Sequence, residues 1–310
     1  MAFEVCSRLL ENLSQVVVGK HACLELLLVA VLGDGHVLLE DVPGLGKTLM
    51  AKALARTIGG SFTRVQCTPD LLPSEVTGFN IYNQQTAQFQ LQAGPVMTNV
   101  LLADEINRAI PRTQSSLLES MEERQVTIDG TTLPLPSPFI VIATQNPIDL
   151  EGTYPLPEAQ LDRFLLKLQP GYPERDEEVA ILERFQDADP LNALSSLTTP
   201  AEVLELQRAR RRIAVSPAVR QYMVDLVRAT RSHGALRYGA SPRAGLALMR
   251  ASQALAALRG REFVLPDDVK QLIRPVLSHR LIIADRERLR GTLVEHVTDE
   301  VVTSTPVPLS

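Results

Sequence analysis

The chain of 310 residues has no tryptophan, three cysteines and few aromatic side chains, which make up 4% of its residues. The cysteines are too few and too scattered for a disulfide framework or a metal cluster. They fit small buried thiols in a reducing compartment, and their positions are Cys6, Cys23 and Cys67. The composition therefore argues against a disulfide-stapled secreted domain and against a cysteine-ligated metal site.

Long apolar runs and basic tails are also missing. The most apolar stretch, residues 24–32, is interrupted by Glu25 and ends at Gly33, so it is too short to span a bilayer. The first residues lack the charged start, apolar centre and cleavage site of a signal peptide. The net charge is −5, which argues against nucleic acid as the main partner. We expect a cytoplasmic protein with no membrane span.

What is present is an alternation of apolar runs and helical patterns. Residues 36–40 form a short apolar run, a turn rich in glycine follows, and residues 48–58 have helical periodicity. Further apolar runs are continuous, as in strands covered on both faces, and lie at 62–66, 100–103, 139–143 and 164–168. With the helical patterns between them, they predict an α/β fold: a three-layer α/β/α core with a five-stranded parallel sheet.

Two segments interrupt this alternation and resemble hairpins. One spans about 78–94 and has a polar turn. The other spans about 125–133 and contains Asp129-Gly130, a strong short-range hairpin signal. We expect both to be insertions in the α/β core.

The character of the chain changes after residue 170. Patterns from about 177 to 261 are helical, without a clear strand, and residues 187–199 suggest a connector or surface loop. The sequence predicts two parts, an α/β/α core over residues 1–170 and a smaller all-helical domain over 171–310 with a short C-terminal tail.

The strongest chemical signal is DVPGLGKT, residues 41–48, between a buried strand and a helix. Phosphate binding requires converging backbone N–H groups and small residues that allow close approach, which Gly44 and Gly46 supply. Lys47 is suited to reach the β- and γ-phosphates and the Thr48 hydroxyl to hold Mg²⁺. This segment predicts a nucleotide site.

The strict form of this loop has glycine where Asp41 stands, but the flanking elements and the end of the loop fit the pattern. The loop residues that we expect to bind nucleotide are Pro43, Gly44, Leu45, Gly46, Lys47, Thr48 and Leu49.

A pair of carboxylates ends the buried run LLADE, residues 101–105. Asp104 fits a role in the Mg²⁺ shell beside Thr48. Glu105 fits a general base that polarises the attacking water. The pair favours hydrolysis over a kinase, which needs an acceptor site, or a GTPase, whose NKxD motif is absent.

Asn146, in ATQNP, follows the apolar run 139–143. If that strand lies beside the strand of Asp104, Asn146 is placed to orient water near the γ-phosphate. On the local sequence alone, a turn residue before Pro147 is the better interpretation.

The succession GKT, DEINRA, ATQNP, LPEAQLDRF and SPRAGLAL closely resembles the MoxR family of AAA+ ATPases, from about Gly19 to His279. The resemblance implies ATP and Mg²⁺ as ligands and Asn146 as the sensor-1 residue. It makes Arg163 an arginine finger for the neighbouring subunit and Arg243 the sensor-2 residue, with a part in catalysis and nucleotide binding. It also implies that Val18 and Gly19 line the adenine pocket and that the two hairpins face a central pore.

The same resemblance implies a homo-oligomer, with a hexameric ring expected, that remodels or activates other proteins or inserts their cofactors or metals. A separate protein with a von Willebrand factor A domain is an expected partner. Three alternatives stay open: a nucleic-acid-dependent motor, a magnesium-chelatase-type motor subunit and a nucleotide-gated scaffold that does not hydrolyse ATP.

Overall fold

The computed structural model describes residues 4–42, 44–147, 152–186 and 189–308. Its centre is a five-stranded sheet of order β2-β5-β8-β1-β9, in which every neighbouring pair is parallel. The predicted parallel sheet is confirmed, with strands β1 (His36–Glu40), β2 (Phe62–Gln66), β5 (Val100–Asp104), β8 (Ile140–Gln145) and β9 (Phe164–Leu168). Because the strands are parallel, their carboxyl ends share one edge of the sheet and their amino ends the opposite edge.

The central strands are buried as the continuous apolar runs predict. Residues 100–103 of β5 and 140–143 of β8 are at most 1% exposed. Strand β2 differs, because it lies at the edge of the sheet and leaves Arg64 and Gln66 exposed. The expectation that β2 is covered on both faces is therefore wrong, and its polar residues become available to the neighbouring strand β5.

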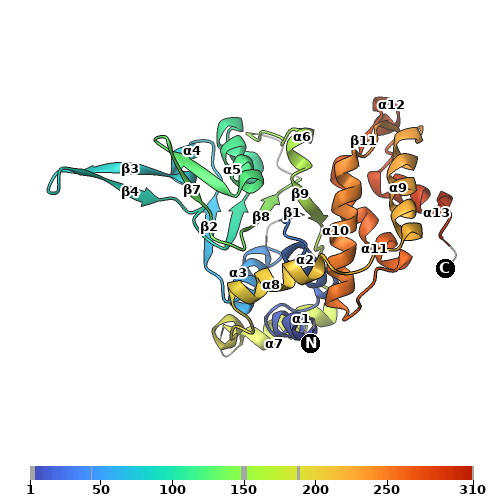
Figure 1. The fold of residues 1–310 in the computed structure, drawn as a ribbon, viewed down its shortest axis with the longest axis horizontal. Coiled ribbons are helices and arrows are strands. Elements are labelled where there is room, and N and C mark those ends of the chain that lie inside the picture. Colours follow the sequence, from blue (N-terminus) through green and yellow to red (C-terminus); the bar gives the residue numbers. More distant parts are fainter. Residues whose placement is uncertain (1–3, 43, 148–151, 187–188, 309–310) are drawn as a thin grey trace.

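Helices cover both faces of the sheet (Figure 1). One face packs against α1 (Glu4–Val16), α2 (His21–Leu32) and α3 (Lys47–Thr57). The other packs against η1 (Ile106–Arg108), α4 (Pro73–Thr77) and α5 (Pro111–Glu123). Leucines on several sides of α2 are buried because this helix lies between the sheet and further helices, so its nearly uniform apolar pattern is explained.

Antiparallel hairpins occur at both places where the sequence suggests them. The first joins β3 (Gly78–Asn83) to β4 (Gln88–Ala93), and Figure 1 shows it projecting from the body at the end opposite the C-terminal helices. The second joins β6 (Gln125–Ile128) to β7 (Thr131–Pro134). Its turn residues Asp129 and Gly130 have φ of 47° and 83°, the left-handed values that a tight hairpin turn requires.

The rest of the chain is mostly helical. After α6 (Glu158–Leu161) and β9, the elements are α7 (Arg175–Phe185), η2 (Pro190–Ala193), α8 (Pro200–Arg210), α9 (Pro217–Ser232), α10 (Pro242–Leu258), α11 (Pro266–Leu277), η3 (Ser278–Arg280), α12 (Asp285–Leu289) and α13 (Val294–Ser304). A two-stranded antiparallel ribbon of β10 (Leu236–Tyr238) and β11 (Ile282–Ile283) lies among them. Strands of two or three residues give no periodic signal, so the sequence does not reveal this ribbon.

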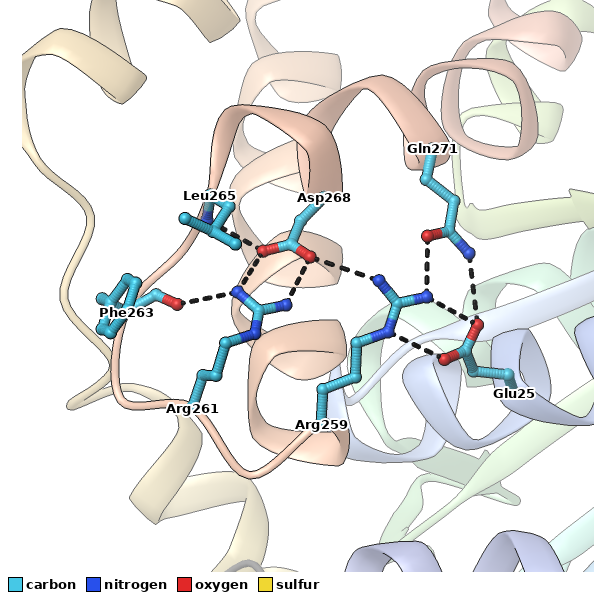
Figure 2. A network of polar contacts seen from close by, with 7 residues as sticks. All are labelled: Glu25, Arg259, Arg261, Phe263, Leu265, Asp268 and Gln271. Atoms are coloured by element: carbon cyan, nitrogen blue, oxygen red, sulfur yellow. Dashed lines mark hydrogen bonds and ion pairs between the residues drawn. The ribbon is translucent and has the colours of Figure 1, made fainter. Parts of the chain in front are cut away.

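The C-terminal helices α9–α13, which we call the lid, pack against the core at α2. One apolar cluster runs from the sheet through α2 into α10 and α11. Figure 2 shows a polar network beside it, in which Arg259 pairs with Glu25 of α2 at 3.0 Å and with Asp268 of α11 at 3.5 Å. Asp268, only 1% exposed, also accepts from Arg261 at 2.6 Å. Apolar packing and charge therefore hold the lid and the core of one chain together.

Candidate nucleotide site

The loop between β1 and α3 has the backbone that phosphate binding requires. Gly44 and Gly46 have φ of 89° and 75°, and among the described residues, chain neighbours aside, no atom lies within 4 Å of where a Cβ would stand. The first turn of α3 follows directly, so its free N–H groups face the same open space. The arrangement fits a phosphate chain. Pro43 lies outside the described residues.

Lys47 is held among negative charges. Its Nζ donates to the backbone oxygen of Asp41 at 2.6 Å. Burial lowers the pKa of Lys47 from its ordinary value, and the nearby carboxylates of Asp41, Asp104 and Glu105 act in the opposite direction. The carboxylates at the end of β5 therefore lie close to Lys47, as the sequence predicts for a shared site.

Asp41, the departure from the strict loop pattern, fastens the loop to a distant segment. Its Oδ1 accepts from the N–H of Val42 at 2.8 Å, and its Oδ2 accepts from the N–H of Gly171. The carbonyl of Gly171 in turn accepts from Lys20 Nζ at 2.8 Å. The Asp41 carboxylate thus connects the loop to the segments that contain Gly171 and Lys20. A pocket lies between these two segments.

This pocket, of about 320 Å³, is large enough for a nucleobase. Gly19, Lys20, Tyr172 and Glu177 are among the residues that line it. Gly19 has φ of 73°, a left-handed conformation that favours glycine, and a Cβ there would stand 2.2 Å from the Glu177 carboxyl carbon, so that side chain would have to move.

The other predicted binding residues lie near this pocket or on the loop. Val18 immediately precedes Gly19 and is half-buried. Leu45 is half-buried on the loop, and Leu49 packs against the core from α3. A larger cleft of about 780 Å³ lies between the lid and the β9 side of the core, and none of the predicted site residues lines it.

Asp104 and the backbone of Glu105 are positioned by Thr144, which the sequence reading missed. The Thr144 hydroxyl donates to Asp104 Oδ1 at 2.5 Å and accepts from the Glu105 N–H at 2.8 Å. Glu105 has φ of 57°, a left-handed conformation that costs a non-glycine residue about 1–3 kcal/mol. The N–H to Thr144 contact helps to offset this strain. The one signal for Thr144 in the sequence is its place in ATQNP, two residues before Asn146.

Two side chains of the edge strand β2 contact the same carboxylates. Arg64 donates to Asp104 Oδ2 through Nη2 at 2.7 Å and Nε at 3.1 Å. Gln66 donates to Glu105 Oε2 at 3.0 Å and accepts from Arg64 at 2.8 Å. Arg108 lies 3.2 Å from the same Glu105 oxygen. Arg64 and Gln66 were also missed, although their i, i+2 spacing on an edge strand places them on one face.

Asn146 follows β8 directly and is 7% exposed. Strand β8 lies between β5 and β1, so the condition set by the sequence, adjacency to the strand of Asp104, is met. The hydroxyl of Thr48 and the carboxylate of Asp104 are the hard oxygen donors that Mg²⁺ prefers. The carboxyl edge of the sheet thus carries Lys47, Asp104, Glu105 and Asn146 together.

Arg163 and Arg243 lie elsewhere. Arg163 immediately precedes β9, at the amino edge of the sheet, and its Nε is 3.6 Å from Glu122 Oε2. Arg243 of α10 donates to Glu122 Oε1 at 2.7 Å. A strand rises about 3.3 Å per residue, so the length of the strands separates Arg163 from the phosphate loop. The structure brings Arg163 and Arg243 to each other and not to Lys47.

Comparison with known proteins agrees with this fold. Residues 36–166 match the model of the ATPase family associated with various cellular activities (AAA), and residues 228–301 match the AAA lid domain. The chain is similar to a solved structure from Cytophaga hutchinsonii, described as a candidate ATPase, with 37% identity, a TM-score of 0.93 and coverage of 99% of this chain and 96% of that one. The fold and the loop therefore define an AAA-type ATPase.

Two curated relatives narrow the assignment. The chain is 45% identical to Chaperone MoxR1 of Mycobacterium tuberculosis, over 95% of this chain and 79% of that protein. It is 47% identical to the uncharacterized protein YeaC of Bacillus subtilis, over 96% and 93% of the two chains. This chain belongs to the MoxR family of AAA+ ATPases.

In the ranges that the structure describes, no helix combines the length and the apolar character needed to cross a bilayer. In the same ranges, no group of three or more His, Cys, Asp or Glu side chains is arranged to hold a metal ion.

Proposed function

We propose that this chain is a Mg²⁺-dependent ATPase that works as a head-to-tail ring and remodels or activates other proteins. The observation that carries the proposal is the separation of two sets of charged residues. Lys47, Asp104 and Glu105 lie at the carboxyl edge of the sheet, whereas Arg163 and Arg243 share Glu122 on the opposite side. One copy therefore holds both halves of an ATPase site but cannot join them.

At the carboxyl edge, the loop from Gly44 to Thr48 binds the phosphates and Lys47 neutralises part of their charge. Glu105 accepts a proton from the attacking water, and Asn146 orients that water. Thr48 and Asp104 hold Mg²⁺, which when bound shields the negative charge of the phosphates. Val18, Gly19 and the pocket beside them receive the adenine.

The arginines complete the site from a second copy. Arg163 supplies positive charge to the γ-phosphate bound in the neighbouring subunit, an effect that reaches about 10³–10⁵ in rate in related phosphoryl transfers. Because Arg243 shares Glu122 with Arg163, we assign it to the same neighbouring site. Head-to-tail contacts of this kind close into rings, and a hexamer is the expected size.

The hairpins support a protein client rather than a nucleic acid. Residues 78–94 contain no charged side chain, so the projecting hairpin offers nothing to neutralise phosphates. It exposes Tyr82 and Phe89, which are 51% and 73% exposed and stack edge to face. We propose that these hairpins contact a client polypeptide in the cytoplasm, with a separate von Willebrand factor A domain protein as adaptor and with metal or cofactor insertion as one outcome.

Complementation between two inactive variants tests the shared site. Arg163→Ala lacks the arginine and Glu105→Gln lacks the base, so each alone should hydrolyse ATP very slowly. In a mixture, a site built from the loop of an Arg163→Ala copy and the arginine of a Glu105→Gln copy has every group. Random mixing should restore roughly a quarter of the wild-type sites. A mixture as inactive as its parts would overturn the shared site, and stimulation by single-stranded DNA would favour the nucleic-acid motor.

A further inference from the structure

Arg163 and Arg243 belong to a larger group of arginines. Glu122, which holds both, also lies near Arg124, and Arg124 pairs with Asp34 at 3.1 Å. The positive charge of Arg250 lowers the pKa of both Arg124 and Arg210. The charge of Arg211 also lowers the pKa of Arg210. We call this group the arginine edge: Arg124, Arg163, Arg210, Arg211, Arg243 and Arg250. It is a concentration of positive charge in a chain whose net charge is −5.

Arg210 lacks part of the compensation that a buried cation needs. It is 4% exposed, and its Nε has no hydrogen-bond partner among the described residues. Burial lowers its pKa to about 10, and the neighbouring arginines Arg211 and Arg250 act in the same direction. A partner carrying negative charge would relieve the repulsion within the edge.

The arginine edge also has an apolar component. Arg243, Leu246 and Arg250 follow one another on α10 at spacings of three and four residues, so they lie along one helix face. Leu246 is 52% exposed. The edge thus presents an exposed leucine between two arginines, a surface suited to a partner that is both apolar and acidic.

Helix α7 has these complementary properties. None of its residues is buried, and Val179, Leu182 and Phe185 leave 46%, 73% and 42% of their surface exposed. These residues are spaced by three and form an apolar stripe on the helix. Its first turn carries the acidic residues Asp176, Glu177 and Glu178. An amphipathic helix that leaves its apolar stripe in water is typical of an interaction site.

The position of α7 indicates which molecule covers it. Its start lies beside the candidate adenine pocket, which Glu177 lines, and Arg184 near its end donates to α1 at Ser14 O (2.9 Å) and Gln15 O (2.7 Å). It therefore flanks the nucleotide pocket, whereas the arginine edge includes Arg163, which we assign to a neighbour's pocket. In a head-to-tail ring these two sides meet.

We infer that α7 of one copy docks on the arginine edge of the next copy. The apolar stripe packs against Leu246, and Asp176 and Glu178 pair with Arg250 and Arg211. This inference rests on the proposed ring and adds to it an interface outside the phosphate site. The contact joins the adenine pocket of one subunit to the lid of its neighbour, so binding of the base and assembly of the ring support each other.

Charge-reversal variants test the contact by sedimentation velocity of the full chain with Mg²⁺ and a slowly hydrolysed ATP analogue. Arg250→Glu and Glu178→Arg should each weaken assembly about tenfold or more, and the double variant should regain most of the loss. Arg220→Glu makes the same charge change at an exposed position of α9 and should leave assembly unchanged. Leu182→Ser should also weaken assembly, whereas Leu289→Ser, at a residue that is 90% exposed on α12, should not.

The outcomes separate this inference from the proposed function. If the wild type assembles but Arg250→Glu, Glu178→Arg and Leu182→Ser assemble equally well, the α7 contact is wrong and the ring stands. If the wild type does not assemble and its ATPase activity per chain is constant on dilution, the ring itself is wrong. Loss of single-stranded oligonucleotide binding in Arg250→Glu, with unchanged assembly, would assign the arginine edge to nucleic acid and overturn the inference.

Discussion

Arg64 Nη2 and Asp104 Oδ2 form an ion pair of 2.7 Å between neighbouring parallel strands. The other oxygen of Asp104 accepts from Thr144, so both carboxylate oxygens are already engaged. Asp104 is also the carboxylate that we propose for Mg²⁺. A cation that occupies a metal-binding carboxylate competes with the metal, and this gives Arg64 an effect that can be measured.

Arg64→Gln should make the site respond to lower Mg²⁺ concentrations. Arg64 is 47% exposed, so the ion pair is screened and contributes little, and the shift should be about two- to fivefold. Binding of a fluorescent ATP analogue, followed while Mg²⁺ is titrated, gives the midpoint without depending on hydrolysis. Arg56→Gln, an exposed arginine on α3, is the control. An unchanged or higher Mg²⁺ midpoint in Arg64→Gln would show that Arg64 does not compete with the metal.

Thr144→Val should disturb both carboxylates at once. Thr144 is 1% exposed, and valine of similar shape leaves the Glu105 N–H and Asp104 Oδ1 without its hydroxyl. Loss of these bonds should cost about 1–3 kcal/mol of unfolding free energy. Displacement of the base should lower ATP turnover about 10–100-fold. Urea unfolding and steady-state hydrolysis measure the two effects.

Thr144→Ser is the matched control because it keeps the hydroxyl. It should retain most of the activity and lose less stability than the valine variant. If serine and valine reduce turnover equally, the methyl group and its packing matter, and the proposed positioning by the hydroxyl is wrong.

These two predictions concern residues that the sequence did not reveal, and the reason is physical. The loop from Asp41 to Thr48 and the run LLADE are local patterns, so the sequence alone is enough to predict them. Arg64 and Thr144 contact Asp104 only because β5 lies between β2 and β8 in the sheet. The order of the strands along the chain does not give their order in the sheet. The place of Arg243 beside Glu122 depends in the same way on how the lid packs.

Asp268→Ala should destabilise the polar network at the start of α11. Its carboxylate is almost fully buried and accepts from Arg261 at 2.6 Å and from the Leu265 N–H at 2.8 Å, as Figure 2 shows. Hydrogen bonds to a charged group contribute about 1.5–3 kcal/mol, and we expect a loss of this order in unfolding free energy. Chemical denaturation measures it. Asp267→Ala removes a neighbouring carboxylate that is 83% exposed and should change stability little. Equal effects of the two substitutions would contradict the role of the network.

Stability should fall as the pH drops below about 6.5, because two histidines are buried in the neutral form. Burial lowers the pKa of His36 and of His279 well below 6.5, and the nearby Arg124 and Arg280 lower them further. Below 6.5 the unfolded chain binds protons that the folded chain does not, so each histidine should cost up to about 1.4 kcal/mol per pH unit. Urea unfolding at several pH values between 5 and 8 measures this slope. His279→Gln, which keeps a donor for the Phe164 carbonyl, should make the slope shallower. An identical slope in His279→Gln and the wild type would show that His279 is not the group that resists protonation.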